Sequence, residues 1–188
     1  MNDSASGGYL IPAQTTPAEE DRSLDLLLAG VVAGISGLDP QWVQPLWQSA
    51  PAADPGQTWC EVGVTAQDAD VNPAITHDSS GEGSDRYRRD QHCTVSCLFH
   101  GPAAKQYAQV LADGVWVPQN REVMGRLGLA CRSASAIRAE PLQTEQTWER
   151  RYALTLVLLR SITRTYLVRN LVSAVSTTHT DIVGATSN

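Results

Sequence analysis

The alternation of apolar and polar residues along the chain predicts its strands. In residues 91–100 every second side chain is apolar, which is typical of a strand with one buried face. The residues on that face are Cys93, Val95, Cys97 and Phe99. Residues 148–160 alternate in the same way, and both faces become apolar in the second half, as in a central strand. Residues 58–64 form a shorter alternating stretch and residues 129–139 a weaker one, so we expect four strands.

Apolar residues spaced three and four apart predict a first helix. Its apolar positions are Leu24, Leu27, Leu28, Val31 and Ile35. Thr16 and Glu19 have the spacing of a capping box, which would start the helix, and Gly37 would end it.

Two further helices are expected between the second and third strands. Pro102 can take the first position of one helix, because its missing N–H costs nothing there, and Gly114 would follow the helix as its C′ residue. Asn120 can then cap a short helix that ends near Leu127.

The expected order is helix, strand, strand, helix, short helix, strand, strand. This order indicates an α+β fold in which helices lie on one side of a mostly antiparallel four-stranded sheet. Residues 16–175 would form a single domain between a flexible N-terminal arm, residues 1–15, and a flexible Ser/Thr-rich C-terminal tail, residues 176–188. Residues 67–89 have no periodicity and many Asp, Asn, Gly, Ser and Pro residues, so we expect a long loop there.

The composition indicates in which cellular compartment the protein resides and whether it contacts a membrane. Residues 1–13 have neither the basic start nor the apolar centre of a signal peptide, so we expect the protein to stay in the cytoplasm in which it is made. The longest apolar run, residues 26–35, is too short to span a bilayer, and no membrane contact is expected. Charged residues make up 18% of the chain, below the average of about 25%. A large shared interface would explain this value, and so would a polar uncharged surface.

Charge is distributed unevenly over the two halves of the chain. Residues 1–85 hold 13 acidic residues against one basic residue, a net charge of −12, and residues 86–188 hold 7 against 13, a net charge of +6. In a ring of identical subunits an acidic surface of one copy could face a basic surface of the next. The alternative is that the two halves pair within one fold or are solvated separately.

No cluster of residues has the spacing of a catalytic or metal site. His92, Cys93, Cys97 and His100 suggest zinc, but on a strand the two histidines point away from the two cysteines. The run that begins at Asp68 resembles a calcium loop, yet Pro73 stands where the loop needs Gly. Residues 86–89 combine three arginines with Tyr87, a composition that suits nucleic acid but is more often a solvated strand entry. We expect no catalytic residue, cofactor or metal, and no enzyme activity.

Three short motifs carry a resemblance to a known family. They are FxGPAA…A…LADG…QNRE…LG in residues 99–128, VQPLWQ in residues 43–48, and a W-x-x-R start with an R-x-Y end in residues 148–166. Together they resemble the neck or tail terminator proteins of long-tailed bacteriophages, over roughly residues 24–172. Leu46 departs from the pattern, which usually has Arg between the Pro and the Trp, so a contact made by that arginine is not expected here.

The resemblance implies a virion structural protein with the same order of elements. Such a subunit would form a ring, a hexamer, that ends the tail tube and joins the tail to the head connector. Its partners would be other copies of itself, the tail tube and sheath proteins, and the head-completion proteins, while DNA passes through the ring without specific binding. It would be assembled in the host cytoplasm and reside in the virion, in the tail or neck. The alternatives are a head-side connector or stopper and, in a different class, a small cytoplasmic enzyme or regulator that uses residues 67–89.

We expect the contacts with neighbouring subunits to involve aromatic residues near Pro45 and arginines from the basic half. The candidate interface residues are Trp42, Pro45, Trp47, Asn120, Arg121, Arg150, Arg151 and Tyr166. The alternative for the tryptophans is burial in the core of the subunit, and for the arginines it is ion pairing within the subunit.

Overall fold

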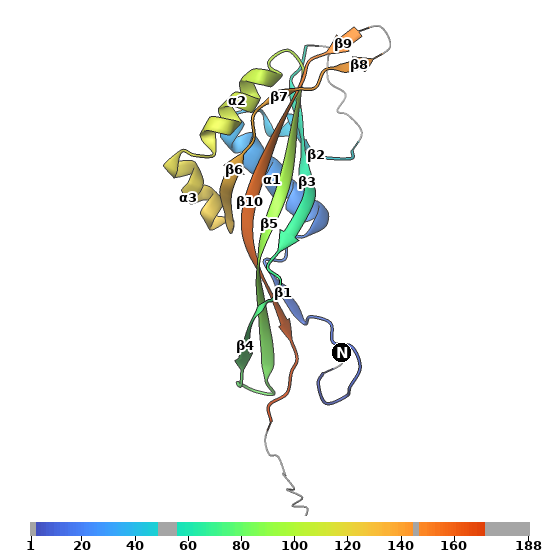
Figure 1. Ribbon diagram of the computed structural model, residues 1–188, viewed down its shortest axis with the longest axis vertical. Helices are drawn as coiled ribbons and strands as arrows, with labels where there is room; N and C mark the ends of the chain where they lie inside the picture. Colours follow the sequence, from blue (N-terminus) through green and yellow to red (C-terminus); the bar gives the residue numbers. More distant parts are fainter. Residues whose placement is uncertain (1–2, 49–55, 145–146, 172–188) are drawn as a thin grey trace, which may run out of the picture.

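Two long antiparallel strands form the spine of the protein. The computed structural model describes residues 3–48, 56–144 and 147–171. Strand β5 (Ser84–His100) pairs with β10 (Arg151–Tyr166) without interruption, from Arg151 opposite His100 to Tyr166 opposite Asp85. The described part of the molecule is therefore elongated, with helices around one half of the spine and strands alone in the other half (Figure 1).

Shorter strands flank the spine on both sides. Strands β3 (Trp59–Ala69) and β4 (Ala74–Asp78) pair with successive parts of β5, and β1 (Gln14–Thr16), β6 (Leu129–Ala134) and β7 (Arg138–Ala139) pair with β10. Strand β2 (Val43–Pro45) lies beside β3 in the parallel direction, which makes the sheet mixed. Strands β8 (Leu142–Thr144) and β9 (Thr147–Glu149) form a separate two-stranded sheet.

The expectation of a four-stranded antiparallel sheet is therefore only partly right. The four expected strands exist as β3, β5, β6 and β10, but the sheet has eight strands and contains one parallel pair. The strands that the sequence did not reveal, β1, β2 and β4, are three to five residues long, and such short segments hardly establish a period of two. The single strand expected at residues 129–139 is divided into β6 and β7.

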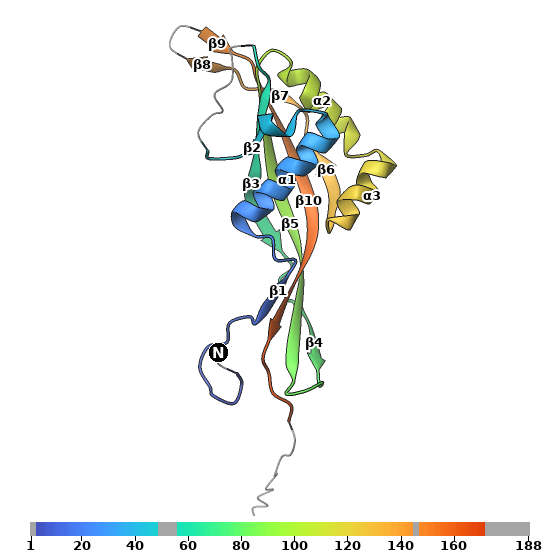
Figure 2. The same ribbon diagram turned by 180° about the vertical axis from the view of Figure 1, so that it is seen from behind.

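The helices lie on one face of the sheet, as expected for this α+β fold. They are α1 (Asp21–Ser36), the 3₁₀ turn η1 (Pro40–Trp42), α2 (Ala104–Gly114) and α3 (Pro118–Arg126). Helix α1 crosses in front of the strands in Figure 2 and lies behind them in Figure 1. The core between the two layers contains the most deeply buried large side chains, which are Phe99, Leu28, Leu111, Met124, Leu154, Leu156, Leu158, Val32, Val62, Val95 and Val115.

Helix α1 ends where the sequence predicted but begins later. Gly37 adopts a left-handed conformation with φ of 75° and caps the helix. The expected cap at Thr16 is wrong, because Thr16 belongs to β1 and the helix begins at Asp21. The capping box is formed instead by Glu20 and Ser23, which are also three residues apart.

The turn between α2 and α3 differs from the expectation in two residues. Gly114 is the last residue of α2 rather than its C′ residue, and a Cβ atom there would collide with the side chain of Ile35 on α1. Asn120 does not cap α3, which begins at Pro118; its side-chain amide donates a 2.9 Å hydrogen bond to the carbonyl oxygen of Gly114. Asn120 thus supplies a hydrogen-bond donor to a carbonyl group at the C-terminal end of α2, where no partner within the helix exists.

Most of the predicted loop at residues 67–89 is strand in the structure. Strand β3 continues to Ala69, β4 occupies Ala74–Asp78, and β5 begins at Ser84. The pattern was invisible in the sequence because this end of the sheet has no helix over it, so neither face needs apolar residues. Among the described residues, no helix is both long and apolar enough to cross a membrane.

Candidate functional site

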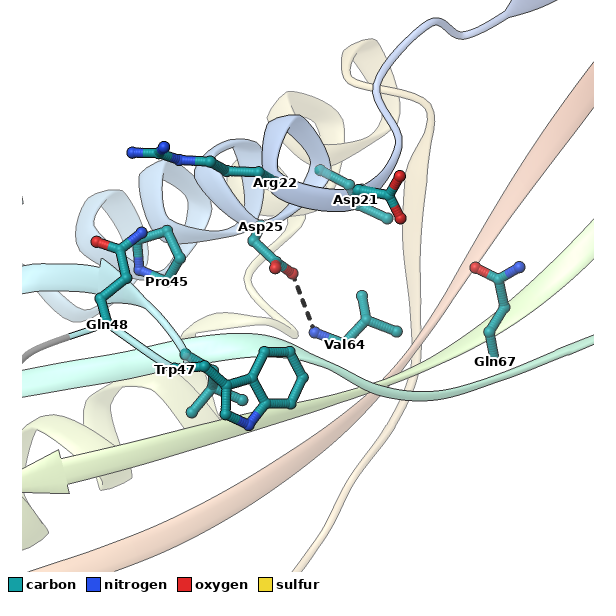
Figure 3. A pocket seen from close by; sticks show the side chains of 10 residues that line it. Asp21, Arg22, Asp25, Pro45, Trp47, Gln48, Val64 and Gln67 are labelled. Atoms are coloured by element: carbon teal, nitrogen blue, oxygen red, sulfur yellow. Dashed lines mark hydrogen bonds between the residues drawn. The ribbon is translucent and has the colours of Figure 1, made fainter.

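A groove lies between the first turns of α1 and the edge of the sheet formed by β2 and β3 (Figure 3). The residues that line it are Asp21, Arg22, Leu24, Asp25, Pro45, Leu46, Trp47, Gln48, Val64 and Gln67. Its walls combine an apolar floor with polar side chains at the rim, and one large aromatic side chain borders it.

Local hydrogen bonds fix the segment that carries this aromatic side chain. Asp39 accepts a hydrogen bond from the backbone N–H of Gln41 and so starts the η1 turn. The chain then pairs with β3 through Val43–Pro45, and the backbone N–H of Leu46 donates a 2.9 Å hydrogen bond to Val62. Proline has no N–H to donate, so Pro45 is compatible with an edge strand of this kind.

Trp47 follows this anchored segment and turns outward. Its φ of 62° lies in the left-handed region, which is rare for a residue with a large side chain, and 78% of the residue is exposed. Neighbouring Leu46 is buried, at the position where the terminator pattern usually has Arg. A large exposed aromatic side chain on a constrained backbone has the properties of an interface anchor.

Helix α1 and strand β3 meet at the other wall of the groove. The carboxylate of Asp25 accepts a 3.1 Å hydrogen bond from the backbone N–H of Val64, and a break in the β3–β5 register follows between Val64 and Ala66. A Cβ atom on Gly63 would lie 3.2 Å from Leu46 and 3.3 Å from Asp25, so the absence of a side chain at Gly63 permits this close approach.

The structure separates the predicted interface residues into three regions. Trp42, Pro45 and Trp47 share the segment after α1, but Trp42 packs against the core and Pro45 is buried, which leaves Trp47 as the exposed member. Asn120 and Arg121 lie on α3, and Arg121 is exposed. The last three are on or next to β10 and are described next.

Arg150, Arg151 and Tyr166 lie at opposite ends of β10. Arg150 is exposed next to the start of the strand, whereas Arg151 makes a 3.6 Å ion pair with Glu140 and donates a hydrogen bond to the Glu140 carbonyl oxygen. Tyr166 ends the strand, and its ring meets Tyr87 edge to face with centroids 5.0 Å apart. Arg151 and Tyr166 are therefore engaged within the subunit.

The cysteine and histidine residues that suggested zinc do not gather around a common point. All four cysteines are buried free thiols, and burial raises the pKa of Cys97 to about 12, so that thiol is protonated at neutral pH. Within the part of the chain that the structure describes, no group of three or more His, Cys, Asp or Glu side chains could hold a metal ion.

Sequence reasoning missed a buried histidine at the helical end of the spine. The ring of His100 stacks on Trp59 with centroids 4.0 Å apart, and its Nδ1 lies 3.3 Å from a carboxylate oxygen of Glu149. Burial lowers the pKa of His100 below its usual value, and the charge of Glu149 partly opposes this. The stack was not visible in the sequence because Trp59 and His100 come from different strands, paired only in the folded sheet.

The fold and the groove together give an α+β protein with helices on one face of a mixed sheet and a large exposed aromatic side chain, Trp47, beside an open groove. Such a side chain is suited to contact with another protein. A comparison with family models then identifies the family. Residues 22–183 match the model of the phage neck terminator proteins, and the chain belongs to that family. It is therefore a structural component of the neck or tail of a bacteriophage virion. No curated protein matches the chain.

Proposed function

We propose that the protein is the tail terminator subunit of a long-tailed bacteriophage. Six copies form a ring on the head-proximal end of the tail, where one face of the ring matches the tail tube, with sheath proteins where they are present, and the other face matches the head-completion proteins. Binding of the ring stops growth of the tube and makes the joint between tail and head. The match of residues 22–183 to the neck terminator family carries this proposal.

The shape of the subunit supports an assembly role. The outermost strands of the sheet differ at its two edges, with β2 on one side and β1, β6 and β7 on the other, so each subunit has two unlike sides to offer to neighbours. Contacts between unlike surfaces of identical subunits build rings when the rotation closes. The mechanism is geometric, and DNA passes through the ring without specific recognition.

Two alternatives lead to different expectations. A head-side connector or stopper would remain bound to filled heads when tails are absent, whereas a terminator would remain bound to tails when heads are absent. An enzyme or regulator built on residues 67–89 has less support, because most of that segment is strand in the sheet rather than a loop that could form an active site.

Removal of the gene tests the proposal most directly. In lysates of the knockout phage, electron microscopy should show DNA-filled heads and separate tails, with tubes that exceed their normal length or lack a stable upper end. Expression of the wild-type protein from a plasmid should restore joined particles. Joined, infectious particles in the absence of the protein would overturn the proposed function.

A further inference from the structure

A second groove, between α1 and α3, is apolar and open. The ten residues that line it are Leu26, Leu27, Gly30, Val31, Gly34, Ile35, Asn120, Val123, Met124 and Leu127, and none of them is charged. The groove has a volume of about 400 Å³, and Leu26 and Val123 at its walls are each about half exposed. Exposed apolar surface of this kind, in a depression, is a common feature of protein interaction sites.

Two glycines of helix α1 leave space in this groove, although glycine lowers the stability of a helix. A Cβ atom on Gly30 or Gly34, one helical turn apart, would meet no atom within 4 Å. Glycine inside a helix is less stable than alanine, and no packing contact within the subunit requires it at these two positions. The open space is therefore available to a group from outside the subunit.

The groove and Trp47 lie on opposite sides of α1, the groove towards α3 and Trp47 towards β2 (Figure 2). Trp47 follows β2, the last strand at one edge of the sheet, whereas α3 precedes and contacts β6, which belongs to the other edge. A protruding side chain on one side and a groove on the other are the two parts of a head-to-tail contact between copies of one chain.

Charge around the two surfaces is complementary. The charged side chains that line the groove beside Trp47 are Asp21, Asp25 and Arg22, which together have a net charge of −1. The segment from Pro118 to Ala134 has a net charge of +2, with exposed Arg121, Arg126 and Arg132 against Glu122. Two surfaces of opposite sign favour the docking of one copy onto the next over the docking of like surfaces.

One polar group in the groove also suits a tryptophan. The amide nitrogen of Asn120 is bound to the Gly114 carbonyl oxygen, which directs its side-chain oxygen elsewhere as an acceptor. A buried indole requires an acceptor for its N–H, and Asn120 is the polar side chain among the ten that line the groove.

We propose that Trp47 of one subunit inserts into the α1–α3 groove of the next subunit and that this contact closes the ring. The inference rests on the ring proposed above and names the two surfaces that form it. The partner is a second copy of this chain, bound head to tail.

Three single variants test the contact in the full-length protein by mass photometry and light scattering. Trp47→Ala removes the inserted side chain, and Gly34→Leu fills the groove without disturbing α1, since leucine is a good helix former. Each should weaken subunit association roughly 30-fold or more. Trp148→Ala removes another exposed tryptophan, on β9, and should associate like the wild type. Circular dichroism checks that all three variants keep the fold.

Mixing the first two variants gives the sharper result. A Trp47→Ala subunit keeps its groove, and a Gly34→Leu subunit keeps its tryptophan, so an equimolar mixture should form dimers and stop there, while each variant alone stays monomeric. If the wild type forms rings and both variants form them equally well, the proposed Trp47–groove contact is wrong, whereas the proposed ring still stands. If the mixture forms no dimers, the contact is also wrong. A wild type that stays monomeric even with tail tubes present would overturn the ring and the contact together.

Discussion

At the scale of single residues, backbone conformation and close packing account for features of Trp47 and Gly114 that their side-chain chemistry alone does not explain. Trp47 holds a left-handed backbone that suits glycine, and Gly114 fills a helix position that alanine would normally favour. In both cases a neighbouring element decides the residue: β2 pairs with β3 up to Pro45 and fixes the chain before Trp47, and Ile35 on α1 occupies the space beside Gly114.

The backbone at Trp47 leads to the first prediction. Trp47→Ala and Trp47→Gly both remove the exposed indole, but glycine adopts the left-handed region without the cost of about 1 kcal/mol that alanine has there. The Gly variant should therefore be as stable as the Ala variant or more stable, although glycine also gains entropy in the unfolded chain. Urea unfolding of the two monomers measures this difference. A Gly variant less stable by 1 kcal/mol would contradict the conformation described for Trp47.

The glycines of the helices supply a matched pair of variants. Gly114→Ala should destabilise the subunit by about 1–3 kcal/mol, because its methyl group overpacks the contact with Ile35. Gly30→Ala should stabilise it by about 0.5–1 kcal/mol, because the space beside Gly30 is open and alanine favours the helix. Thermal unfolding would reveal both signs, and equal effects of the two changes would show that α1 and α2 do not pack as described.

At the scale of elements, the sequence predicted the strands and helices that pack against the core. It missed those that are held in place only by pairing with a neighbouring strand. The alternation of Val95 and Cys97 with polar residues indicated β5 because one face of that strand meets the helices. The same strand was not recognised before residue 91. The half-buried and exposed positions still alternate there, but nearly all of them hold polar or charged residues, so the sequence shows no apolar period of two. The groove beside Trp47 was predicted only as an aromatic segment, since the opposite wall comes from α1 and β3, and nothing in a single sequence reveals which elements will meet.

The end of the β4–β5 hairpin is tied to the chain after β10. His77 bridges Asp85, at 2.6 Å from Nδ1, and Asn170, at 2.9 Å from Nε2. The amide nitrogen of Asn170 donates to the carbonyl oxygens of Ser79 and Gly81, so its oxygen faces His77. Both ring nitrogens of His77 therefore face acceptors, and only the protonated imidazolium can donate to both.

This arrangement predicts a dependence on pH. The hydrogen bond to Asp85, followed by that to Asn170, raises the pKa of His77 above its usual value of 6.5. Because the folded pKa is the higher one, the stabilisation is fully present below about pH 6.5 and is lost as the pH rises through the folded pKa. An NMR titration of the His77 ring should give a pKa above 6.5, and Asp85→Asn should lower it. An unchanged pKa in the Asp85→Asn variant would exclude the carboxylate as the main cause.

At the scale of the whole molecule, charge should affect assembly more than folding. Arg121 is exposed on α3 beside the apolar groove, and no salt bridge among the described residues involves it. The basic side of the subunit is therefore available to a neighbour.

Reversal of this charge leads to a prediction that depends on salt. Arg121→Glu should impair ring formation more strongly at low than at high ionic strength, because ions screen the added repulsion. Arg150→Glu, one residue before β10, tests whether other exposed arginines contribute. Mass photometry over a salt series measures both, and a loss of folding rather than of association would assign Arg121 to the interior of the subunit.

The uninterrupted pairing of β5 with β10 has a mechanical consequence. Their 16 paired positions join the helical end of the subunit to the end that carries His77, so a tensile load along the spine strains all of these backbone hydrogen bonds together. In a pulling experiment, attachment at Ser84 and Arg151, on different strands at opposite ends, should give a higher rupture force than attachment at Asp85 and Tyr166, which opens the ladder one pair at a time. In the ring proposed above, a subunit built in this way would bear tension between the head and the tail.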